Sequence, residues 1–360
     1  MDDRPYAFLS TLLATPSVSG FEQPAAKVIK DYLKPYATEV RTDVHGNTLF
    51  ALNPKGSPRV MLAGHVDQIG FLVNHINEQG FIYLTAVGGV DLAVVPGLRL
   101  HLHGRNGPVL GVIGRKAIHL MKPEERDGGK KFDLTELHVD IGAKNKEEAL
   151  KLVDVGDSVT YILGVAKLGD DLITGPGLDD KVGAFVVAEA LRLLAERAKK
   201  SPGKLKAAVY SVATVQEEIG LRGAHTAAFG IDPQVGIAID VCHATDYPGA
   251  DEKMAGTMKA GKGPSLSIGP NINPPLNKIL FAAAHKAGIA VQKEAAPRAT
   301  GTDANVIQVT RSGVAAALVG LPCRYMHTPV EVVSLADLEA AAKLLAEAIW
   351  GLTGETSFIP

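Results

Sequence analysis

One stretch of the chain places an apolar strand directly before two acids. Residues 207–215 are mostly apolar or β-branched, and Gln216, Glu217 and Glu218 follow at once. A run this apolar indicates a strand buried on both faces, as in a parallel sheet covered by helices. Because a buried unpaired carboxylate costs several kcal/mol, acids in this position usually hold a metal or transfer protons. The alternative is a pair of solvated glutamates on a loop.

Three further apolar runs lead to a histidine or an acid, and one helix start carries an acid. With the first strand they supply two imidazoles and four carboxylates, which are His65, Glu217, Glu218, Asp240, His327 and, at the helix start, Asp179. In open α/β sheets the ligand crevice lies outside the C-terminal ends of the strands, so we expect one cleft to collect these side chains. Each residue alone also fits a structural histidine, a helix cap or a solvated acid. The joint pattern favours a site.

These side chains suit Zn²⁺, Co²⁺ or Mn²⁺ rather than an oxygen-only Ca²⁺ cage. Their number favours two ions that share the carboxylate of Asp179. His65 and Asp240 then complete one ion, and Glu218 and His327 complete the other.

Two acids are expected to act beside the metals. Glu217 is left without an ion, and a water held between two ions about 3.5–4 Å apart needs a base. Asp67 follows His65 by two residues on the same side of its strand. We therefore predict Glu217 as the general base, and we predict that the Asp67 carboxylate accepts the His65 ring N–H and fixes its orientation.

Residues 70–168 show a different secondary-structure pattern from the rest of the chain. Short β-like runs separated by turn residues indicate a small barrel or sandwich there, whereas the flanking chain alternates strand and helix. We predict an α/β fold with a mixed, largely parallel sheet sandwiched by helices and an inserted small β-barrel domain. Residues 1–69 and 165–360 form the discontinuous catalytic domain of this prediction, and residues 70–164 form the insert.

Composition excludes several classes of function. The 37 basic and 39 acidic residues give a net charge of −2, without the basic excess that nucleic acid or a membrane surface attracts. No apolar run approaches the roughly 18 residues of a membrane span, and the N-terminal residues do not resemble a secretory signal. The two cysteines, Cys242 and Cys323, form no CxxC pair. We expect a cytoplasmic protein with reduced thiols and no nucleic-acid or membrane partner.

Several motifs together resemble one known family. They are GHVDQIGFLV, GLDDKVGAFV, TVQEEIGLRGA, IDVCHATDYPG, GKGP, TGTDANVIQVTRSGV and RYMHTPVEVV. In this order, and across nearly the whole chain, they resemble the M42 family of dinuclear metallo-aminopeptidases, which includes glutamyl, leucyl and deblocking aminopeptidases and tetrahedral particles. Gln68 is a departure, because family members commonly carry Glu there.

The resemblance implies a zinc-peptidase-like fold and specific roles. The implied metal ligands are His65, Asp179, Glu218, Asp240 and His327, with Glu217 as base and Asp67 in the orienting role. Asp179 is preferred to Asp180 as the bridge because related sequences often carry Asn at the second position. The implied cofactors are two divalent ions per subunit, Zn²⁺ or Co²⁺, and the implied substrates are peptides with a free N-terminus. The inserted domain is expected to mediate homo-oligomerisation, commonly into a dodecamer.

The substrate pocket and the reaction leave alternatives open. We expect the pocket for the first residue near the Ile272-Asn273 segment and the segment from Thr300 to Asn305, with Thr300, Gly301, Thr302 and Asp303 as the substrate-binding residues. One alternative is an amidase or deacylase with the same metals. Another is an endoglucanase-like glycoside hydrolase. That reaction would leave two histidines unused, and this chain has only one Trp to stack against sugars. A third is a non-catalytic particle stabilised by metal.

Overall fold

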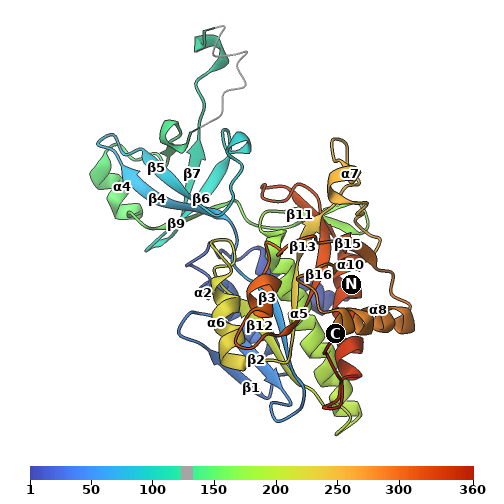
Figure 1. The fold of residues 1–360 in the computed structure, drawn as a ribbon. Coiled ribbons are helices and arrows are strands. Elements are labelled where there is room, and N and C mark those ends of the chain that lie inside the picture. Colours follow the sequence, from blue (N-terminus) through green and yellow to red (C-terminus); the bar gives the residue numbers. More distant parts are fainter. Residues whose placement is uncertain (123–132) are drawn as a thin grey trace.

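The chain forms two bodies, and the computed structural model describes its residues 1–122 and 133–360. Figure 1 shows a larger body that contains both termini and a smaller barrel beside it. Each body has its own apolar core. The segment 123–132 lies within the predicted insert and outside the described residues.

The larger body is built on an eight-stranded mixed sheet. Its four central strands are parallel and almost completely buried; in spatial order they are β12 (Ala208–Thr214), β3 (Arg59–His65), β13 (Val235–His243) and β16 (Ala315–Cys323). One edge continues antiparallel through β2 (Thr48–Leu52) and β1 (Glu39–Thr42). At the other edge, β14 (Ser265–Ile268) runs antiparallel to β16 and pairs in parallel with β15 (Gln292–Ala295).

Helices cover both faces of this sheet. Because side chains alternate along a strand, Val60 and Leu62 of β3 face one helical layer, and Met61 and Ala63 face the other. The first layer comprises α1 (Asp3–Leu13), α2 (Gln23–Leu33), α5 (Leu178–Lys200), α8 (Pro274–Ala287) and α10 (Leu335–Trp350). The second comprises α6 (Arg222–Ile231) and α9 (Asp303–Gln308).

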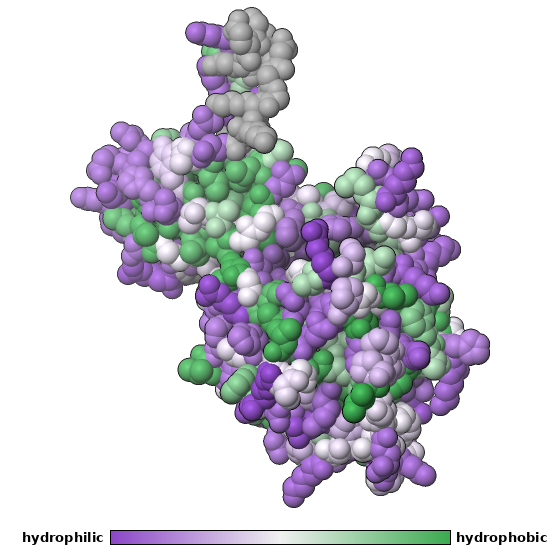
Figure 2. All heavy atoms as spheres, in the orientation of Figure 1, coloured by the Kyte–Doolittle hydropathy of each residue, from purple (hydrophilic) through white to green (hydrophobic). Residues whose placement is uncertain are grey.

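The smaller body is a closed antiparallel barrel with the strand order β4-β5-β8-β7-β6-β9. These strands are β4 (Gly70–Ile76), β5 (Ile82–Val87), β8 (Val139–Asp140), β7 (Gly107–Ile113), β6 (Arg99–Gly104) and β9 (Ser158–Tyr161), with α4 (Lys146–Leu152) beside them. Closure pairs every edge, so the barrel needs no further strand. Figure 2 shows hydrophobic side chains on its outer surface; the exposed ones in this part of the chain include Leu110, Val112, Ile118 and Leu120.

Short elements complete the described structure. A three-stranded sheet consists of β10 (Ala166–Leu168), β11 (Leu172–Gly175) and β17 (Glu331–Ser334). The remaining helical turns are η1 (Leu92–Val94), η2 (Ile118–Leu120), η3 (Leu134–Glu136) and α7 (Glu252–Ala255). Within the described ranges, we find no helix with the length and apolar character that crossing a membrane requires.

The structure confirms the predicted fold class, including the mixed sheet between helices and the closed barrel. The domain boundaries at residues 70 and 164 stay a prediction. One strand end differs, because β13 continues past Asp240 to His243. Its pairing with β16 persists to His243, opposite Cys323, so a charged side chain does not end the strand here. Asp240 therefore projects from within the sheet.

Candidate metal centre

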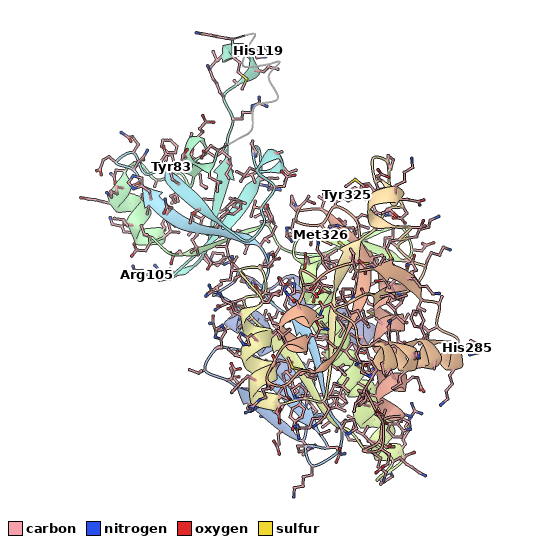
Figure 3. All side chains as sticks on the ribbon, viewed as in Figure 1. Tyr83, Arg105, His119, His285, Tyr325 and Met326 are labelled. Carbon is pink, nitrogen blue, oxygen red and sulfur yellow. The ribbon has the colours of Figure 1, made fainter. Side chains whose placement is uncertain are left out.

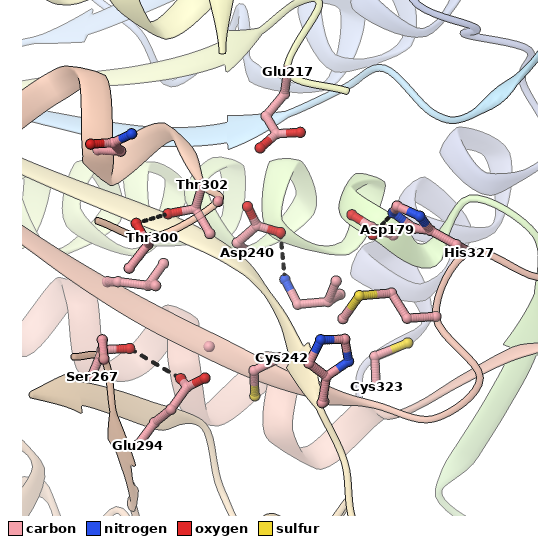
Figure 4. A pocket seen from close by; sticks show the side chains of 18 of the residues that line it. Asp179, Glu217, Asp240, Cys242, Ser267, Glu294, Thr300, Thr302, Cys323 and His327 are labelled. Atoms are coloured by element: carbon pink, nitrogen blue, oxygen red, sulfur yellow. Dashed lines mark hydrogen bonds and ion pairs between the residues drawn. The ribbon is translucent and has the colours of Figure 1, made fainter. Parts of the chain in front are cut away.

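Asp179 lies between the two predicted histidines. Its Oδ1 is 3.2 Å from Nε2 of His65, and its Oδ2 is 3.2 Å from Nε2 of His327. His65 ends β3, and Asp179 lies in the first turn of α5, where Asp179 and Asp180 depart from helical backbone angles and share a cis peptide bond. Each carboxylate oxygen thus faces a different imidazole, as a carboxylate shared between two ions requires. Figure 4 shows the contact between Asp179 and His327.

Three further acids close the cluster. From Nε2 of His65, Oε2 of Glu217 is 3.7 Å away and Oδ1 of Asp240 is 3.9 Å away. Oε2 of Glu218 is 3.6 Å from Nε2 of His327. Two sets of three ligand atoms lie within 4.8 Å of one another; they come from His65, Asp179 and Glu218, and from His65, Glu217 and Asp240. The fold thus brings together all six residues selected at strand and helix ends.

Asp67 makes different contacts from those predicted. Nδ1 of His65 lies 3.0 Å from the main-chain carbonyl of Asp67 and 3.5 Å from its carboxylate. The buried carboxylate instead accepts the main-chain N–H groups of Glu217 at 3.0 Å and Glu218 at 3.2 Å, and the hydroxyl of Ser19 at 2.6 Å. Because Thr214 pairs with His65, the turn after β12 lies beside Asp67. Asp67 therefore orients His65 through its main chain and the two glutamates through its side chain.

Two residues that the sequence reasoning missed hold the ligands in place. Glu331 accepts the main-chain N–H of His327 at 2.9 Å and that of Asp179 at 3.2 Å, one with each carboxylate oxygen. Gly89, in the loop after β5, has its carbonyl 2.9 Å from Nδ1 of His327, so the chain of the insert reaches the site. Glu331 could have been selected from the sequence, because it is an acid at the start of an apolar run, four residues after His327. Nothing in the sequence marks Gly89.

Burial and crowding shape the charges of the cluster. Burial raises the pKa of Glu217 to about 10. Burial, together with repulsion by Asp179, raises the pKa of Asp240 well above its usual range. Burial acts the same way on Asp179, but hydrogen bonds from the two histidines outweigh it and hold the pKa of Asp179 well below its usual range. Carboxylates packed this closely repel one another, so their joint ionisation requires a cation.

The donor set fits divalent cations. Nδ1 of His65 and Nδ1 of His327 each face a main-chain carbonyl. A neutral ring that donates there would offer the lone pair of Nε2 to a cation held by the acids. Oε1 of Glu218 is buried and has no hydrogen-bond partner among the described residues. A buried oxygen without a partner requires an explanation, and a bound cation supplies one.

The cluster opens into a cleft of about 870 Å³. The predicted substrate residues Thr300, Gly301 and Thr302 line this cleft. Tyr325 and Met326 line it as well, where the larger body faces the barrel (Figure 3). Its size is in the range of sites that enclose a small ligand.

Three residues expected near the pocket lie elsewhere. Asp303 is buried behind the lining, where Oδ2 accepts the Thr214 hydroxyl at 2.6 Å. Ile272 packs in a small apolar cluster, and Asn273 caps α8 through its side chain. A side chain that starts a helix directs its polar atoms at the helix amides, which removes Asn273 from the cleft.

A cleft beside a largely parallel sheet that gathers two imidazoles and four carboxylates is typical of metal-dependent hydrolases. The chain belongs to the M42 family, because its residues 46–344 match the model described as M42 glutamyl aminopeptidase. It is 38% identical to the lysyl aminopeptidase of Pyrococcus furiosus over 342 residues, 94% of this chain and 95% of that one.

Solved structures agree with this assignment. The TET aminopeptidase from a marine sediment archaeon of the Thaumarchaeota superposes with a TM-score of 0.91 at 35% identity, covering 98% of both chains. The Pyrococcus horikoshii TET1 peptidase, described as assembling into a tetrahedron or a large octahedral shell, gives 0.85 at 30% identity, covering 97% of this chain and 100% of that one. The family resemblance is thereby confirmed. The chain is a hydrolase that acts on peptides.

Proposed function

We propose that the chain is an aminopeptidase that works with two divalent cations, Zn²⁺ or Co²⁺, held on either side of Asp179. His65 and Asp240 would hold one ion, and Glu218 and His327 the other. The observation that carries this proposal is the equal approach of the two Asp179 oxygens, each 3.2 Å from a different imidazole. A single ion would lie beside only one of these two pairs of an Asp179 oxygen and an imidazole.

The chain's own residues supply the remaining chemistry. When bound, such a pair of ions polarises a carbonyl and lowers the pKa of water. Glu217 takes the proton of the attacking water and delivers it to the leaving amine. Its Oε2 lies within the ligand cluster, 3.7 Å from His65, which supports this role. Asp67 and Glu331 position the acids and the second histidine.

The substrates in this proposal are peptides with a free N-terminus. Thr300, Gly301 and Thr302 would form part of the wall that receives the first residue, which their place in the cleft supports. The relatives do not identify that residue, because the family model is described as glutamyl and the Pyrococcus furiosus relative as lysyl.

We further propose that the barrel, as a domain of residues 70–164, mediates homo-oligomerisation, with a dodecamer as the form. Exposed apolar side chains in this part of the chain support an interface there. The assemblies described for the TET1 peptidase support a large particle. A cytoplasmic location is consistent with the free thiols of Cys242 and Cys323.

Hydrolysis of aminoacyl p-nitroanilides tests the proposal. Metal-free protein is assayed before and after addition of Zn²⁺ or Co²⁺, with N-acetylated forms of the same substrates as the matched control. The proposal expects metal-dependent cleavage of the free-amine forms only. Preferred cleavage of the acetylated forms would support the amidase or deacylase alternative instead. Cellulose hydrolysis that survives EDTA would support the glycosidase.

A further inference from the structure

The cleft contains a carboxylate that the proposed mechanism does not use. Glu294, on β15, lines the cleft together with the metal-centre residues. In Figure 4 it lies with Ser267 at the far end of the view from Asp179 and His327. The sequence reasoning did not select it, because β15 is a short, largely polar edge strand without an apolar run before the acid.

The register of the sheet connects Glu294 to the metal centre. Asp240 pairs with Gly320 of β16, and Gly320 pairs with Ser265 of β14. Ser267, two residues further on the same face of β14, pairs with Glu294. A Cβ on Gly320 would lie 2.2 Å from the Ser265 hydroxyl, so Gly320 presents no side chain to this row. Asp240 and Glu294 therefore project from the same face of the sheet, and Gly320, which lies between them, adds no side chain to that face.

The separation suits a long side chain. The strands of Asp240 and Glu294 are three inter-strand spacings apart in the sheet order, or about 14 Å between their backbones. A peptide whose α-amine lay at the metal centre could extend its first side chain along the row of paired residues from Asp240 to Glu294. A lysine or arginine places its charge at the end of a long flexible stem.

The surroundings of Glu294 leave its charge uncompensated. The buried hydroxyls of Ser265 and Ser267 both donate to Oε2, at 3.0 Å each. Among the described residues Glu294 forms no ion pair, and its neighbour Lys293 lies over the ring of Phe281 instead. Hydroxyl donors stabilise a carboxylate while leaving its second oxygen for a ligand.

The other charged residues that line the cleft do not form a counter-charge to Glu294. Two divalent cations balance the four acids Asp179, Glu217, Glu218 and Asp240 of the metal centre. Arg298 is the one lysine or arginine in the described lining, and it is exposed on the loop after β15. Once metals are bound, Glu294 is thus the one acid of the described lining that no cation contacts, because the exposed Arg298 forms no ion pair with it.

We propose that Glu294 selects peptides whose first residue is lysine or arginine, by pairing with the cationic end of that side chain. This proposal rests on the proposed aminopeptidase function. It also predicts poor cleavage of peptides that begin with glutamate, because a second carboxylate would face Glu294 without a counter-ion.

The test compares lysine with norleucine p-nitroanilide, because norleucine has the same stem without the amine. With metal bound, we expect kcat/KM of the wild type for lysine to exceed that for norleucine by about 10- to 100-fold, the range of a charge-assisted hydrogen bond. Glu294→Gln keeps an acceptor for the serines and should bring this ratio close to one, with norleucine changed less than about threefold. Glu355→Gln, at an exposed acid near the C-terminus, should leave the ratio unchanged.

Three outcomes would overturn the proposal. Equal losses for both substrates in Glu294→Gln would make Glu294 a merely structural acceptor. Norleucine cleaved as well as lysine by the wild type would remove the preference while leaving the aminopeptidase function intact. No turnover of any free-amine substrate by the metal-loaded wild type would instead overturn the proposed function, and this proposal with it.

Discussion

Oδ1 of Asp67 accepts a hydrogen bond from the main-chain N–H of Glu217, 3.0 Å away and 150 positions later in the chain. The second oxygen of Asp67 does the same for Glu218 at 3.2 Å. These bonds join the end of β3 to the turn after β12. Asp67 thus determines where the proposed base and a proposed ligand project, without being a ligand itself.

Removal of the Asp67 charge should weaken the site without unfolding the chain. An asparagine retains one acceptor oxygen, so Asp67→Asn loses one of the two main-chain bonds. We expect kcat/KM and metal affinity to fall by about 10- to 100-fold, as for other residues that position metal ligands. Asp140→Asn in the barrel is the matched control. A change below threefold in both quantities would contradict the positioning role.

Glu217 and Glu218 should differ sharply when each is replaced by glutamine. Glu217→Gln removes the proposed base, so kcat should fall by roughly 10²- to 10⁴-fold while the metal content stays the same. Glu218→Gln removes a proposed ligand and should lower the metal content itself. Metal analysis of both variants beside their kinetics makes the comparison. Full activity in Glu217→Gln would exclude it as the base.

Metal removal should cost both activity and stability. Dialysis against EDTA leaves the buried acids without counter-charges, and ligands that bind only the folded state stabilise it. We expect loss of aminopeptidase activity, a lower Tm, and recovery of both on addition of Zn²⁺ or Co²⁺. Unchanged activity after exhaustive chelation, verified by metal analysis, would contradict a metal-dependent reaction.

Glu22 should make stability depend on pH. It is 4% exposed, and burial raises its pKa from 4.5 to about 7 in the folded chain. Folding therefore favours its protonated form, and the stability it contributes is complete below pH 4.5 and is lost as the pH rises through 7. Glu22→Gln retains an acceptor for the Gly20 N–H without titrating.

The Tm of Glu22→Gln should therefore exceed that of the wild type by roughly 3 °C at pH 8 and by much less at pH 4.5. Scans of both proteins at the two pH values measure this difference. Asp31→Asn, at an exposed position, controls for the loss of a carboxylate. An equal Tm difference at both pH values would show that the effect does not come from ionisation of Glu22.

The sequence predicted the site where local pattern and topology coincide. Buried parallel strands have almost wholly apolar sequences, so a histidine or acid at their ends is conspicuous, as with His65 and Glu217. The topology of an open sheet then places such ends side by side. Asp240 was found in this way even though β13 continues past it.

Contacts between distant segments could not be predicted from the sequence. Glu331 and Gly89 act through hydrogen bonds to His327 that depend on how β17 and the barrel loop pack. The Asp67 carboxylate was assigned to His65, its neighbour in sequence, whereas it accepts hydrogen bonds from amides in the turn after β12. Glu294 lies on an edge strand whose polar sequence carries no sign of the cleft beside it. Pattern analysis identifies residues near a strand end, and only the fold shows what else reaches them.

An anomalous-difference map from crystals grown with Co²⁺ or Zn²⁺ tests the central claim most directly. The account predicts two peaks on either side of the Asp179 carboxylate, about 3.5–4 Å apart, one beside His65 and the other beside His327. A single peak at full occupancy, or peaks that do not contact Asp179, would contradict it.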